Sequence, residues 1–115
     1  MPIDTWFPLA VYYEDLPGAV GLKKQLIAAA LQLEQAGYER RAFPEMAWTG
    51  DLHGAEQIHR DPRFAWIVGQ VEIHVKCYLT RLGLDLDHLE LYIQRAWPGI
   101  SRHQQEVGSH CHNTA

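Results

Sequence analysis

The sequence predicts an α+β fold in which two helices pack beside a few antiparallel strands. Two stretches carry apolar residues at the spacing of a helix that is buried on one side. Residues typical of strands, aromatic or in apolar–polar alternation, precede the first stretch and follow the second. The resulting order is strand, helix, loop, helix, strand, strand, which favours helices packed against one antiparallel sheet.

Length and composition indicate one domain over residues 1–115. The chain is 47% hydrophobic and 21% charged, so we expect a real core. A net charge of -4 argues against nucleic acid or an anionic membrane as the main partner, since both attract basic surfaces. No apolar run approaches a membrane span, and the N-terminus does not resemble a signal peptide. Two cysteines make no disulfide framework, so we expect a cytoplasmic location.

The first strand is predicted over residues 6–13, where Pro8 indicates an edge position or a bulge. Asp15 and Pro17 then suit the start of a helix over 19–36, and Gly37 suits its end. One side of this helix is apolar and carries Leu22, Leu26, Ala30 and Leu33. We expect that side to pack on the core.

The second helix is the clearest element, with Asp61 as its N-cap, Pro62 as its first residue and Gly83 as its end. Its apolar stripe consists of Phe64, Val68, Val71, Val75, Tyr78, Leu79 and Leu82. Cys77 is predicted to be a small buried residue and His74 a surface histidine beside the stripe.

Residues 38–60, between the helices, are irregular and turn-rich. Asp51, His53 and His59 in this loop have the side chains of metal ligands. They are equally typical of a polar loop surface, and we prefer that interpretation because no supporting polar residues are evident around them.

After the second helix, Leu84 and Leu86 alternate with acidic residues, and apolar residues alternate again over 89–93. This predicts strands with a bulge at 87–88, an extension over 95–97 and a turn at Pro98-Gly99. Two or three strands are few for two apolar helices, so we expect further strands after Ala115.

His110 and His112 are the candidate metal ligands. On an extended strand, residues two apart point to the same face, while Cys111 between them points to the other. Two converging imidazoles can begin a site for iron, zinc or copper. A catalytic metal usually has about three protein ligands, and the third is not evident in this sequence.

Several segments together resemble the small bacterial and phage 2-oxoglutarate/Fe(II)-dependent oxygenases. They are Trp48-Thr49-Gly50-Asp51, Asp61-Pro62 with Phe64, Tyr78-Leu79 before Leu82-Gly83, and Gln94-Arg95-Ala96-Trp97-Pro98. The final segment, His110-Cys111-His112-Asn113-Thr114-Ala115, resembles the H-x-H-x-x-A segment of that family. The resemblance covers the whole chain and about the first half of a typical member.

The resemblance implies the N-terminal part of a double-stranded β-helix, or jelly roll, with two supporting helices. It also implies Fe(II) and 2-oxoglutarate as cofactors, His110 and His112 as metal ligands, and hydroxylation of an unidentified substrate. The superfamily places a carboxylate two residues after its first histidine, whereas this chain has His112 after His110, or Thr114 after His112. We expect the distal histidine and the residue that grips 2-oxoglutarate beyond Ala115, so these 115 residues are not expected to complete catalysis alone.

Two alternatives remain open. The chain can be a non-enzymatic module, alone or as a homodimer that covers its open sheet edge, with both histidines in an exposed tail. It can also be a cupin-like metal protein with three or four histidine ligands, since Gly108-Ser109-His110-Cys111-His112 partly matches a cupin segment.

Overall fold

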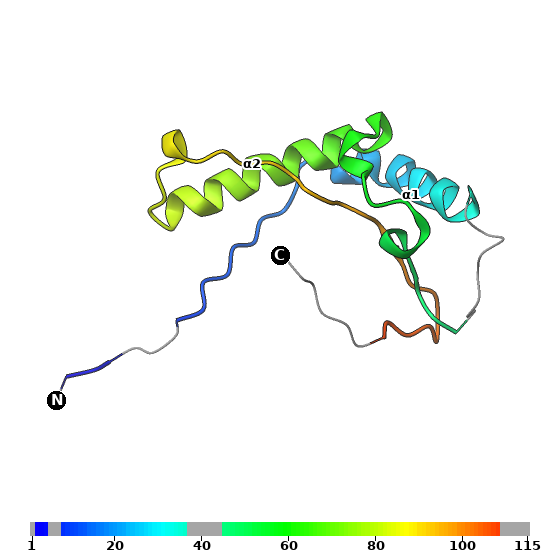
Figure 1. Ribbon diagram of the computed structural model, residues 1–115, viewed down its shortest axis with the longest axis horizontal. Helices are drawn as coiled ribbons and strands as arrows, with labels where there is room; N and C mark the ends of the chain where they lie inside the picture. Colours follow the sequence, from blue (N-terminus) through cyan, green and yellow to red (C-terminus); the bar gives the residue numbers. More distant parts are fainter. Residues whose placement is uncertain (1, 5–7, 37–44, 109–115) are drawn as a thin grey trace.

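The computed structural model describes residues 2–4, 8–36 and 45–108 and shows an α+β arrangement, as the sequence predicts (Figure 1). Two long helices, α1 (Ala19–Ala36) and α2 (Ala65–Arg81), accompany a two-stranded antiparallel sheet of β1 (Trp48–Thr49) and β2 (Gly99–Ile100). Short 3-10 helices occur at Gly50–His53, Ile58–Arg60, Pro62–Phe64 and Leu86–His88. No helix in these described ranges is long and apolar enough to cross a membrane.

Both predicted helices are present, although α2 begins at Ala65, after a separate 3-10 turn at Pro62–Phe64. Helix α1 has the predicted bounds. The Asp61 carboxylate accepts a hydrogen bond of 2.9 Å from the Arg63 N–H and caps the turn that leads into α2. Gly83 ends α2 with φ 88, where its own N–H and that of Leu84 donate to carbonyls of the last turn. This left-handed glycine satisfies carbonyl oxygens that the helix leaves unpaired.

The strand predictions over 8–13 and 84–93 are wrong for the described residues, whereas Ala96 in the predicted extension forms a single parallel bridge with Gln57. Residues 8–13 and 89–95 are extended but pair with no neighbouring strand in the described part of the chain. Leu86–His88 is a 3-10 helix because the Asp85 carboxylate accepts the Asp87 N–H at 3.0 Å and favours a turn. The actual sheet pairs Trp48 with Ile100 and Thr49 with Gly99, which the pattern assigned to a loop and a turn.

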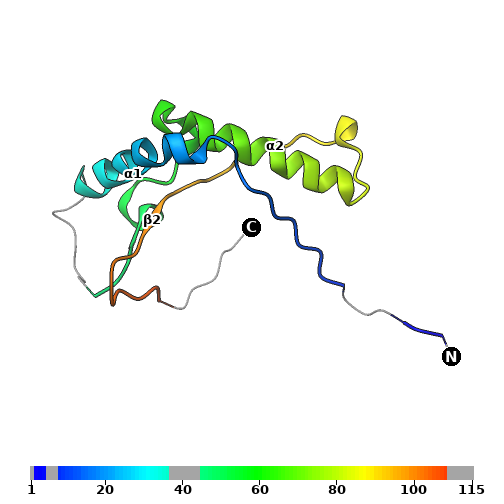
Figure 2. The ribbon, with the colours of Figure 1, turned by 180° about the vertical axis from the view of Figure 1, so that it is seen from behind.

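The return segment, residues 84–100, runs back along α2 from its end towards its start (Figure 1). Seen from behind, α1 lies beside the first turns of α2 (Figure 2). Helix α1 contacts the Pro62–Phe64 turn, where the Arg63 guanidinium donates to the Gln32 amide oxygen at 2.8 Å. The two long helices therefore meet at the start of α2.

Burial follows that geometry. Among the described residues, the buried apolar side chains are Ala29, Trp48 and Phe64. Further along the α2 stripe, Val71 is 47% exposed and Leu82 50%. The radius of gyration is 17.8 Å, whereas a compact domain of this length has about 13 Å. The expected large core is therefore not present in the described residues.

Candidate metal centre and the loops before it

The candidate ligands His110 and His112, with Cys111, lie outside the described residues. The chain that leads to them is described as far as Gly108. The Ala47 N–H donates to the Glu106 carbonyl at 2.9 Å, and the Glu106 N–H donates to the Glu45 carbonyl at 3.1 Å. These bonds fix residues 105–107 alongside 45–47.

An ion pair joins this C-terminal segment to α1. The Arg102 guanidinium donates two hydrogen bonds of 2.6 Å to the two carboxylate oxygens of Glu34. Glu34 is only 5% exposed, and its carboxylate raises the pKa of Arg102. A bidentate pair of hydrogen bonds fixes the orientation of the guanidinium as well as its distance from the carboxylate. Sequence reasoning missed this pair because its members are 68 residues apart and neither belongs to a motif.

The loop after β1 packs tightly on the return segment. The Gly50 N–H donates to the Pro98 carbonyl at 2.9 Å, and the Gly50 carbonyl accepts from Ala55 at 2.8 Å. A Cβ at position 50 would lie 2.6 Å from the Ala55 oxygen and 2.9 Å from Pro98 Cδ, so this site requires glycine. Further along, the Ala96 N–H donates to the Glu56 carbonyl, and the Ala96 carbonyl accepts from Ile58. We call residues 45–60 and 94–108 together the loop platform.

Inside the platform, Trp48 is 2% exposed and its ring stacks on His53 with centroids 5.6 Å apart. His53 Nδ1 donates to the Thr49 carbonyl at 2.9 Å, since a carbonyl can only accept. The half-buried Asp51 and His59 each keep one buried polar atom without a hydrogen-bond partner. Among the described residues, no three side chains of suitable type are placed to hold a metal ion. Asp51, His53 and His59 therefore do not form the metal site considered above.

A second cluster, the Tyr12 clasp, holds the N-terminal segment on α2. It consists of Tyr12, His74, Tyr78 and Arg81. The Tyr12 hydroxyl is hydrogen-bonded to His74 Nδ1 at 2.7 Å, and the Tyr78 hydroxyl donates to the Ala10 carbonyl at 2.9 Å. The Arg81 guanidinium lies 5.5 Å from the Tyr12 ring centre, a cation–π contact.

The structure refines one prediction about α2 and corrects another. His74 lies beside the stripe as predicted, but it is half-buried because its ring is hydrogen-bonded to Tyr12. Cys77 is exposed instead of buried, because the described chain places no element over that side of α2. The aromatic composition of residues 6–13 was a sequence signal for this docking, although it was interpreted as a strand.

Comparison with protein-family models, curated proteins and solved structures finds no match to this chain.

Proposed function

We propose that the chain forms part of a jelly-roll oxygenase that uses non-haem Fe(II) and 2-oxoglutarate, with His110 and His112 as two metal ligands. The observation that carries the proposal is this pair of histidines, two residues apart, directly after the loop platform. Their spacing suits a strand that presents both imidazoles to one metal ion.

The packing of the platform supports the proposal. Two of the segments that resemble the oxygenase family, 48–51 and 94–98, are far apart in sequence but hydrogen-bonded through Gly50 and Pro98. The ion pair between Glu34 and Arg102 ties the segment before His110 to α1. A rigid support of this kind is what a metal site needs, because its ligands must be held to within a fraction of an ångström.

The donor set partly fits the proposed cofactors. Two neutral imidazoles are ligands that Fe(II) accepts, and a small number of protein ligands leaves positions for 2-oxoglutarate and O2. When bound, the iron and the co-substrate supply the oxidising chemistry that hydroxylates a C–H bond. The role of this chain is to bind and orient the metal through His110 and His112. A catalytic metal usually takes a third protein ligand as well.

Metal titration tests this assignment. Calorimetry with Co(II), a stand-in for Fe(II) that is stable in air, should show one site on the purified chain. His110→Ala and His112→Ala should each weaken binding at least about tenfold, or about 1.4 kcal/mol. His103→Ala is the control, because His103 is exposed and lies outside the pair. Binding that survives both substitutions would remove the metal site from the proposal.

Turnover is tested separately, on the protein isolated from its native source. With Fe(II), O2 and 2-oxoglutarate but no substrate, we expect the protein to form succinate slowly. The His110→Ala protein should form none. If the protein binds metal but forms no succinate, the metal site stands and the oxygenase activity is excluded.

The structure favours a second candidate, a binding module that associates with another copy of itself. The specific observation is the apolar surface left uncovered along the second half of α2 and its flanking segments. Soluble monomers rarely leave large contiguous apolar patches exposed. This candidate requires no metal, so its test is independent of the titration above.

A further inference from the structure

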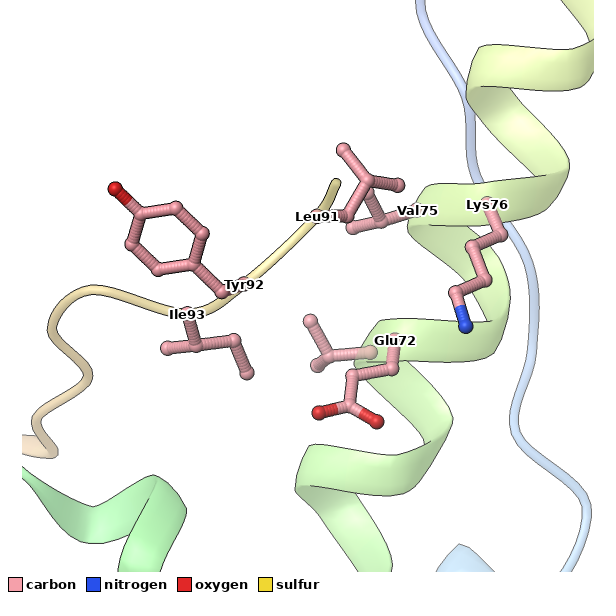
Figure 3. A pocket seen from close by; sticks show the side chains of 7 residues that line it. Glu72, Val75, Lys76, Leu91, Tyr92 and Ile93 are labelled. Atoms are coloured by element: carbon pink, nitrogen blue, oxygen red, sulfur yellow. The ribbon is translucent and has the colours of Figure 1, made fainter. Parts of the chain in front are cut away.

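A groove runs between α2 and the return segment (Figure 3). Val71 and Val75 line it from the helix, and Leu91 and Ile93 line it from the return segment. Its volume is about 210 Å³, enough for one or two apolar side chains. In the described part of the chain, the backbone groups of residues 90–93 take part in no hydrogen bond. The groove therefore combines an apolar floor with an open strand edge.

The N-terminal segment has the complementary features. Its side chains alternate: Tyr12 is held in the clasp on α2, whereas Leu9, Val11 and Tyr13 are 88%, 71% and 88% exposed. Of the backbone groups at residues 9–13, the described contacts use only the Ala10 carbonyl. The segment is therefore an extended apolar strand with one face covered and one face free.

These two surfaces do not meet within one chain. The pale blue N-terminal segment and the segment that carries Leu91 lie on different sides of α2 (Figure 3). The contacts agree, since the helix faces the N-terminal segment with His74 and Arg81 and the groove with Val71 and Val75. Each surface is therefore available to another copy.

We propose that a second copy of this chain covers both surfaces by reciprocal exchange. Residues 9–13 of one copy lie antiparallel to residues 89–93 of the other, with Leu9 opposite Ile93, Val11 opposite Leu91 and Tyr13 opposite Leu89. The free face of the strand then fills the groove of the partner, while Tyr12 stays on its own α2. The exchange is the same in both directions, so it closes as a two-fold dimer.

The exposed area is sufficient for a dimer. The exposed apolar residues that line the groove or belong to the two paired segments are Leu9, Val11, Tyr13, Val71, Val75, Leu89, Leu91 and Tyr92. Their exposed surface is on the order of 1,000 Å² per copy, compared with about 800 Å² that each partner buries in a standard interface.

Sedimentation equilibrium over the micromolar to high-micromolar range tests the dimer. We expect the unmodified chain to dimerise and Val11→Asp to weaken dimerisation at least about tenfold, because it would bury a carboxylate in the apolar groove. Val20→Asp is the matched control, since Val20 is 92% exposed on α1 and lies outside both surfaces. Circular dichroism of each variant should show unchanged helix, because both side chains are exposed.

Cross-linking tests the register. In a background with Cys77→Ser and Cys111→Ser, chains carrying Val11→Cys and chains carrying Leu91→Cys are mixed and oxidised. The mixture should give a disulfide-linked pair of the two chains, because the two positions are directly opposite. A mixture of Val20→Cys and Leu91→Cys chains should give much less.

Two results would overturn the inference. One is a chain that stays monomeric throughout this concentration range. The other is a dimer that withstands Val11→Asp and does not cross-link position 11 to position 91. Neither result bears on the histidines, so failure of the dimer is distinguishable from failure of the metal site.

Discussion

The two ends of α2 differ sharply, although one apolar stripe runs along both. At its start, Phe64 is 4% exposed and lies near α1 and the loop platform. At its far end, Val75 and Leu82 on the same stripe are 43% and 50% exposed. The stripe therefore shows which side of the helix favours burial, but it does not show what covers that side or whether the cover belongs to the same chain.

Two ion pairs show a similar contrast in burial. Glu34, on α1, is almost fully buried against Arg102. The pair of Glu56 and Arg95, which joins the two parts of the loop platform, has side chains 39% and 46% exposed. Water screens an exposed pair strongly, so the two ion pairs should differ greatly in their contribution to stability.

The largest expected effect contrasts Phe64 with Val75. Phe64→Ala should lower the free energy of unfolding by about 3–5 kcal/mol, because it leaves a cavity where α1 meets the start of α2. Val75→Ala should cost less than about 1 kcal/mol in urea denaturation at low protein concentration. If the loss of stability caused by Val75→Ala rises with protein concentration, the groove is covered in the dimer. Equal losses for Phe64→Ala and Val75→Ala would contradict the contrast between the two ends of α2.

The ion pairs give the next largest effect. Arg102→Ala removes both hydrogen bonds to the Glu34 carboxylate and should lower the melting temperature clearly, because it leaves a buried carboxylate without its partner. Arg95→Ala, the matched change in the exposed pair, should cost less than about 1 kcal/mol. Thermal unfolding at equal concentration measures both. Similar losses for the two variants would mean that the Glu34 site is open to water.

The smallest effect concerns the caps. Asp61→Ala should cost about 1 kcal/mol at neutral pH, whereas Asp85→Ala, at the exposed 3-10 turn, should cost only a few tenths. Hydrogen bonds from the Arg63 side chain and backbone lower the pKa of Asp61 below 3.8 in the folded chain. Its contribution is therefore complete above that pH and is lost as the pH falls through the lowered pKa. Unfolding measured from pH 6 to pH 2 should show this loss in the unmodified chain and not in Asp61→Ala.

Sequence patterns predicted the helices because helices depend on neighbours close in sequence. The spacing of Leu22 and Leu26, the cap at Asp61 and the stop at Gly83 are all local signals, and the structure confirms them. Strands depend on a distant partner, so alternation over 89–93 did not ensure pairing. The actual pairing of Trp48 with Ile100 involves two residues in each strand, too few to produce a pattern. The metal-ligand pair, His110 and His112, stays a prediction.

The short sheet also has a consequence for the order of folding. Trp48 and Ile100 are joined by a loop that contains the whole of α2 and the return segment. Closing a loop of about fifty residues costs conformational entropy that two paired residues in each strand cannot repay. The sheet should therefore form only after α2 has brought its flanking segments together. In pulsed hydrogen exchange during refolding, the Gly50 amide should gain protection later than the amides of α2.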